Sequence, residues 1–100
     1  MVKHILLFKL KQSPPRGTKE ENAREMKKQI EALKRKIPCI INIEVGINTG
    51  KSENAWDCSL YSEFENFADL AHYREHPEHI KVVGLVNEVC EQRCVVDYEV

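Results

Sequence analysis

Residues 2–10, Val-Lys-His-Ile-Leu-Leu-Phe-Lys-Leu, form a stretch whose alternation predicts a β-strand with two different faces. Successive side chains of a strand point to opposite sides of a sheet, so even-numbered and odd-numbered residues form two sets. The even-numbered set is Val2, His4, Leu6, Phe8 and Leu10, and the odd-numbered set is Lys3, Ile5, Leu7 and Lys9. Because both sets contain large apolar residues, we expect this strand to be covered on both faces.

The chain leaves this strand through turn residues 13–17 and then enters a predicted helix that ends at Pro38. Apolar residues recur in the helix at the spacing of a single stripe along its surface. The stripe consists of Ala23, Met26, Ile30, Leu33 and Ile37. Thr18 is the expected N-cap, because a threonine hydroxyl accepts a hydrogen bond from a free N–H of the first turn.

The remaining chain shows three more alternating segments, which predict strands at residues 39–48, 54–62 and 93–100. A short helix is expected after Ser62-Glu63-Phe64-Glu65, which has the form of a capping box. A further helix is expected to begin near Pro77, because proline is tolerated at the first helical position.

The predicted order of elements is strand, helix, strand, strand, helix pair, strand. This order is typical of an α+β, ferredoxin-like domain, in which a four-stranded antiparallel sheet carries its helices on one face. We expect residues 1–100 to form one such domain. The second face of the sheet still carries apolar residues that no further layer can cover, so a homodimer is expected. We place its interface on His4, Leu6, Phe8, Trp56 and Val96.

Composition narrows the functional classes. The chain has 100 residues and a formal net charge of −1, which argues against a nucleic-acid partner. No apolar run is long enough for a membrane helix, and no secretory leader precedes the first strand, so a cytoplasmic protein is expected. We expect the four cysteines to be reduced thiols. They are Cys39, Cys58, Cys90 and Cys94.

Four segments of the chain carry a resemblance to one protein family. They are Val2-Lys3-His4-Ile5-Leu6-Leu7-Phe8, Ile37-Pro38 followed by Ile43-Glu44-Val45-Gly46, the strand exit from Asp57 to Phe64, and Tyr73-Arg74-Glu75-His76-Pro77-Glu78-His79 with a closing Val96-Asp97-Tyr98. Together they resemble the stress-responsive dimeric α/β-barrel (Dabb) family over nearly the whole chain. The resemblance implies two ferredoxin-like subunits whose sheets form one barrel. Most family members have no assigned activity, some are plant stress proteins, and one is a plant polyketide cyclase.

The resemblance to that cyclase implies a catalytic pair, His79 and Tyr73. An aldol cyclisation needs a base with a pKa near neutrality and a hydrogen-bond donor for the developing enolate, and these two residues can supply both. His4, Cys58 and His76 are the expected ligand-binding residues, with Cys58 standing where the cyclase has a histidine. Structural roles remain open beside these, because His76 and His79 can each cap a helix and Tyr73 can simply pack.

The sequence offers two candidate metal sites. His72, His76 and His79 have a spacing that would aim three imidazoles at one zinc ion on a continuous helix, but Pro77 breaks that helix, so no zinc site is expected. The resemblance implies instead a structural Mg²⁺ on backbone carbonyls at the end of the long helix. These carbonyls belong to Lys34, Ile37 and Ile40.

Two functional hypotheses follow from the sequence. In the first, the chain is a family member of unassigned activity, a homodimer with a small pocket for a hydrophobic ligand. In the second, it is a cofactor-free cyclase or isomerase that acts on a carbonyl, polyketide-like substrate. No organic cofactor is expected, because the four glycines form no phosphate-binding loop.

Overall fold

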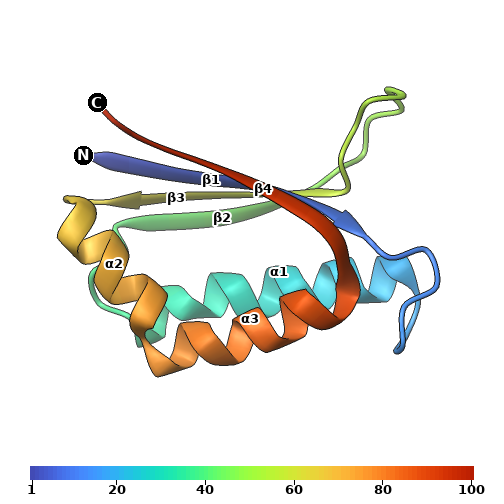
Figure 1. The fold of residues 1–100 in the computed structure, drawn as a ribbon, viewed down its shortest axis with the longest axis horizontal. Helices are drawn as coiled ribbons and strands as arrows, with labels where there is room; N and C mark the ends of the chain where they lie inside the picture. The colour runs from blue at the N-terminus through green and yellow to red at the C-terminus, as the bar shows by residue number, and fades with distance from the viewer.

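The computed structural model describes all residues from Met1 to Val100 as four strands and three helices (Figure 1). In chain order they are β1 (Val2–Leu10), α1 (Lys19–Lys36), β2 (Asn42–Ile47), β3 (Cys58–Phe64), α2 (Phe67–Glu75), α3 (Pro77–Val89) and β4 (Cys90–Glu99). This is the order predicted from the sequence. β2 and β3 begin later than predicted, while β4 begins earlier and directly continues α3.

The strands form one antiparallel sheet in the order β2-β3-β1-β4, and the helices lie on one side of it (Figure 1). The predicted ferredoxin-like α+β fold is therefore confirmed. The apolar stripe of α1 packs toward the sheet, with Met26 and Leu33 at most 1% exposed. The connection between β2 and β3 extends away from the helices, beyond the open face of the sheet (Figure 1).

Two of the three helix N-termini lie where the sequence predicted them. Thr18 caps α1 in a complete capping box with Glu21, and Pro77 is the first residue of α3. The capping box expected at Ser62 is wrong, because Ser62 lies inside β3 and α2 is capped by Asn66. The Ser62 hydroxyl instead donates to the backbone oxygen of His4 at 3.1 Å.

The even-numbered face of β1, which was expected at the dimer interface, is instead the face that the helices cover. His4 and Phe8 are buried beneath the helices, 5% and 2% exposed. The predicted interface is therefore wrong for His4, Leu6 and Phe8, which share the helix-covered face. The odd-numbered set of β1 faces away from the helices, where Ile5 pairs with Val96. The physical reason lies in the two lysines of that set, since charged side chains are costly to bury against helices.

The open face of the sheet, defined as the face opposite the helices, keeps an apolar strip along β1 and β4. Its members are Ile5, Leu7, Val96 and Tyr98. Trp56 borders it, because the Lys9 ammonium lies 5.3 Å from its ring centroid. The structure contains no disulfide, and none of its helices combines the length and apolar character needed to cross a bilayer.

Candidate active site

The site forms around the break between α2 and α3. Proline lacks an N–H and disfavours a helical conformation in the residue before it, so α2 ends and α3 begins at the His76-Pro77 step. His76 is extended, with φ −66° and ψ 135°, and its Nδ1 accepts a hydrogen bond from the Glu78 N–H at 3.1 Å. His76 therefore acts as the N-cap of α3, which is the structural role left open by the sequence.

His79 lies one turn into α3 and turns back toward α2. Its Nδ1 is 3.0 Å from the backbone oxygen of Arg74. A carbonyl can only accept, so Nδ1 carries the proton, and in the neutral ring Nε2 is left with a free lone pair. Burial lowers the pKa of His79 from its ordinary value of 6.5, and the nearby His4, Arg74 and Arg93 contribute to the lowering. The imidazole is therefore neutral at neutral pH.

Tyr73, near the end of α2, is the largest fully buried side chain of the molecule. Its ring centroid lies 4.4 Å from that of His79, 5.0 Å from that of Phe64 and 6.1 Å from that of His4. Burial raises the pKa of Tyr73, so its hydroxyl stays protonated. No hydrogen bond joins this hydroxyl to the rest of the chain, and since no fully buried polar atom lacks a partner, the hydroxyl reaches the cavity, where it can donate to a ligand.

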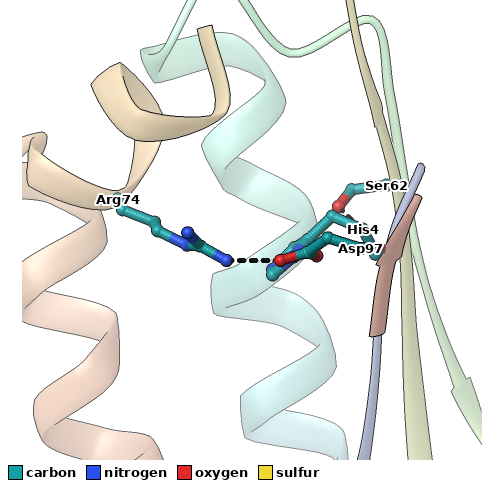
Figure 2. A network of polar contacts seen from close by, with 4 residues as sticks. All are labelled: His4, Ser62, Arg74 and Asp97. Atoms are coloured by element: carbon teal, nitrogen blue, oxygen red, sulfur yellow. Dashed lines mark hydrogen bonds and ion pairs between the residues drawn. The ribbon is translucent and has the colours of Figure 1, made fainter. Parts of the chain in front are cut away.

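His4 is fixed by a carboxylate from the neighbouring strand. Its Nδ1 donates to Oδ1 of Asp97 at 2.5 Å, and Arg74 donates to Oδ2 of the same carboxylate at 2.6 Å (Figure 2). Burial lowers the pKa of His4 despite the opposing effect of Asp97. Burial acts to raise the pKa of Asp97, but the hydrogen bonds from His4 and Arg74 outweigh it and the pKa is lowered. The pair is a neutral imidazole oriented by a carboxylate.

These residues surround one cavity of about 50 Å³ between the sheet and the helices. Its lining consists of His4, Leu6, Phe8, Ile30, Leu60, Tyr73, His79, Val82, Val83, Val86 and Arg93. Three predicted site residues, His4, Tyr73 and His79, are thus brought together. Cys58 and His76 are not part of the lining.

Cys58 lies farther along the sheet, in register with Phe8. Burial raises the pKa of its thiol to about 11, so the protonated thiol dominates at neutral pH. A buried protonated thiol is a poor nucleophile and a weak ligand. Cys58 is therefore a core residue in this structure, and its role in ligand binding stays a prediction.

Neither candidate metal site gains support from its surroundings. No group of three His, Cys, Asp or Glu side chains is placed to hold an ion, and His79 faces the cavity instead of joining His72 and His76. At the end of α1, the Ile37 oxygen already accepts the Ile40 N–H at 3.2 Å. Three basic side chains occupy the same last turn. Neutral oxygens beside positive charges suit Mg²⁺ poorly. The site on Lys34, Ile37 and Ile40 stays a prediction.

Sequence reasoning missed Asp97, Arg74 and Arg93 as site residues. Asp97 belongs to the Val96-Asp97-Tyr98 segment, but only the pairing of the first and last strands places it opposite His4. Arg74 lies within the Tyr73-to-His79 segment that carries the family resemblance, which implies no role for it, and Arg93 belongs to no motif. Their importance appears only once α2 and β4 are packed around the cavity.

Comparison with known proteins agrees with this architecture. The sequence profile of the stress-responsive A/B barrel domain (Dabb) matches residues 2–100. The chain belongs to the Dabb family. No curated protein matches the chain significantly.

Solved structures of similar fold include one close relative of this Dabb protein. A dimeric protein of unknown function with a ferredoxin-like fold, from Bacteroides fragilis, is 43% identical, with a TM-score of 0.88 over 99% of this chain and 95% of that chain. An Arabidopsis thaliana protein is 22% identical, with a TM-score of 0.84 over 100% and 95%. A hydroxynitrile lyase from Passiflora edulis is 16% identical, with a TM-score of 0.83 over 99% and 92%. The last two show a shared fold only.

Proposed function

We propose that this Dabb protein is an acid–base catalyst that removes a proton next to the carbonyl group of a small substrate, as in an isomerase or an aldol-type cyclase. The observation that carries the proposal is the shared cavity of His4, Tyr73 and His79. Two imidazoles there have their Nδ1 atoms fixed by acceptors, and a tyrosine hydroxyl has no partner in the chain.

His79 is the proposed base. Its Nε2 takes the proton from the carbon next to the carbonyl. The electron pair of that C–H bond forms a C=C double bond, and the π pair of the carbonyl moves onto its oxygen, which gives an enolate. The Tyr73 hydroxyl donates a hydrogen bond to this oxygen and stabilises the developing charge. The lowered pKa keeps His79 neutral and able to accept a proton, and the raised pKa keeps the Tyr73 hydroxyl protonated and able to donate.

His4 is proposed to return or accept a proton on the other side of the cavity. Asp97 holds its Nδ1, so the orientation and the protonated nitrogen of the ring are both defined. A cyclisation needs a second proton transfer after the new bond forms, and an isomerisation needs one at a neighbouring atom. A second fixed imidazole lining the same cavity can serve either reaction.

The cavity volume limits the substrate. About 50 Å³ is far below the roughly 300–1,000 Å³ of pockets that enclose drug-sized ligands. The reacting end of a small carbonyl compound fits, with the rest extending toward solvent. A polyketide chain would require side chains of α3 to move apart.

The second candidate function is binding of a small apolar ligand without turnover. It is favoured by the lining, because 8 of its 11 residues are hydrophobic. A binding protein has no need for two oriented imidazoles, so the catalytic proposal accounts for more of the site.

We further propose that the chain is a homodimer through its open face. Homologous structures from Bacteroides fragilis, Thermobifida fusca and Jannaschia are dimeric. The support in this chain is the apolar strip on that face, in which Leu7, Val96 and Tyr98 are exposed and Ile5 is half-buried.

The catalytic proposal is tested by following hydrogen–deuterium exchange next to the carbonyl of small ketones in D₂O by proton NMR. Exchange that is faster with protein than with buffer, and that is lost in the His79→Gln variant, supports the proposal. A ligand that binds at the cavity with no exchange above the buffer rate would favour the binding function instead.

A further inference from the structure

The cavity carries one permanent charge, the guanidinium of Arg93. All other lining residues are hydrophobic or are the rings of His4, Tyr73 and His79, and no Asp or Glu is among them. Arg93 lies on β4 opposite Phe8, which places it on the helix-covered side of the sheet. It is itself exposed, so it stands at the mouth of the cavity.

Arg93 has no partner in the chain. It takes part in none of the ion pairs, and Asp97, the carboxylate that orients His4, has both oxygens occupied by His4 and Arg74. Glu91 and Arg93 both line a separate hollow of about 150 Å³, but no ion pair joins them. The guanidinium is therefore free to bind an external anion.

The positive charge of Arg93 also affects the pKa of His79. Burial is the main cause of the lowered pKa of His79, and repulsion from Arg93 adds to it. An anion bound at Arg93 would thus be held close to His79 and Tyr73. Arg93, Tyr73 and His79 line the same cavity, and this shared lining links the free guanidinium to the reacting groups.

Resting on the function proposed above, we infer that the substrate is a small carbonyl compound bearing a carboxylate, which Arg93 binds while the carbonyl lies between Tyr73 and His79. A guanidinium matches a carboxylate through two parallel N–H donors. A phosphate dianion would need further donors, and the cavity lining offers no second cation. The class is therefore a short oxo acid.

The experiment compares matched pairs of ligands that differ only in charge. 2-Oxobutanoate and 4-oxopentanoate are each tested against the corresponding primary amide. Binding is measured by NMR titration of the Arg93 side-chain Nε–H and of backbone amides around the cavity, and turnover by exchange next to the ketone in D₂O. We expect at least one acid to bind about tenfold or more tightly than its amide, since hydrogen bonds to charged groups are worth more than neutral ones.

Variants test whether the preference for the acid over its amide depends on Arg93. Arg93→Gln should abolish the ratio of acid to amide affinity, Arg93→Lys should retain part of it, and Glu91→Gln should leave it intact. Added salt should reduce the ratio, because screening weakens the attraction. Equal binding of acid and amide, or a preference that survives Arg93→Gln, would overturn the inference.

The two proposals fail in different ways. Exchange of neutral ketones with no preference for acids would leave the catalytic function standing and refute the charged substrate. An Arg93-dependent preference for acids without any exchange would support the anion site and refute the catalytic function.

Discussion

The ring of Tyr73 lies 4.4 Å from the ring of His79, although the two residues belong to different helices. The break at His76-Pro77 makes this possible, because it turns α3 so that His79 faces back toward the end of α2. On an uninterrupted helix, residues six apart point to different sides. The proline therefore builds the site without taking part in its chemistry.

Replacing His79 by glutamine should remove the proposed base while keeping the fold. Glutamine is similar to histidine in size and polarity, and the bond from Nδ1 to the Arg74 oxygen that it loses is one neutral hydrogen bond, so the melting temperature should fall only slightly. The rate of exchange next to the carbonyl should fall by about 10² to 10⁴, the usual contribution of a general base. Proton NMR of the ketone in D₂O gives the rate, and thermal unfolding gives the stability.

His76→Ala is the matched control. It removes the N-cap of α3, which should cost about 1 kcal/mol of the free energy of unfolding, but it leaves the cavity lining intact. If His76→Ala abolished exchange and His79→Gln did not, the assignment of roles to the two histidines would be wrong.

Replacing Tyr73 by phenylalanine should lower the rate without lowering stability. The Tyr73 hydroxyl has no hydrogen bond to lose, so the free energy of unfolding should change by less than about 0.5 kcal/mol. The kcat should fall by about 10² because the enolate loses its donor. Tyr61→Phe, which loses a 2.8 Å bond to Glu63 on the open face, should leave kcat unchanged. A large loss of stability in Tyr73→Phe would indicate a packing role only.

Activity and stability should both depend on pH through the buried imidazoles. The folded pKa values of His79 and His4 lie below the ordinary 6.5, so the unfolded chain binds protons first as the pH falls. The free energy of unfolding should therefore be greatest above pH 6.5 and decrease as the pH falls below it. The groups facing His79 are Tyr73, His4, Arg74 and Arg93.

The rate of exchange should follow the same direction, because only the neutral form of His79 accepts a proton. NMR titration of the imidazole protons tests this directly. In His79→Gln, the decrease of stability below pH 6.5 should become shallower, as measured by urea unfolding at several pH values. A titration of His79 above 6.5 would contradict the prediction.

The architecture could be predicted from the sequence because its signals are local. The apolar stripe of α1, the Thr18 cap and Pro77 each depend on a few neighbouring residues. The capping-box pattern at Ser62 failed for the same reason, since β3 continues past Ser62 and buries it against β1. A local pattern does not show when a sheet extends across it.

The site could be predicted only in part. The resemblance of the His-Pro-x-His step identified His79 and Tyr73, and alternation placed His4 on one face. The predicted interface used the even-numbered face of β1, which the helices in fact cover. Lys3 and Lys9 indicate that the odd-numbered face is the less buried one. Asp97 and Arg93 depend on the register of β4 against β1, which alternation alone does not determine.

Removing Asp97 should cost more stability than removing its partner Arg74. Asp97→Ala leaves the buried His4 N–H without an acceptor, which costs about 1–3 kcal/mol. Arg74→Gln loses an ion pair of a half-exposed arginine, worth about 0–1 kcal/mol. The double variant should cost little more than Asp97→Ala, because both changes remove the same contact. Equal losses in the two single variants, measured by urea unfolding, would show that the pair with Arg74 is the stronger one.

The proposed dimer interface can be tested with two single variants, one that places a charge on the open face of the sheet and one that places it on the helices. Val96 is 54% exposed in the isolated chain, pairs with Ile5 on the open face, and should be buried in a dimer. Val96→Asp places a carboxylate there, and burying an unpaired charge is costly, so the dimer should dissociate. Sedimentation velocity at micromolar concentration measures the oligomeric state.

Ile80→Asp is the control for this substitution. Ile80 is 59% exposed on α3, the layer that covers the other face of the sheet, so the same change there should leave the dimer intact. A dimer that survives Val96→Asp but dissociates with Ile80→Asp would place the interface on the helices. It would also leave the open face of the sheet without a partner, which its apolar strip of Ile5, Leu7 and Tyr98 argues against.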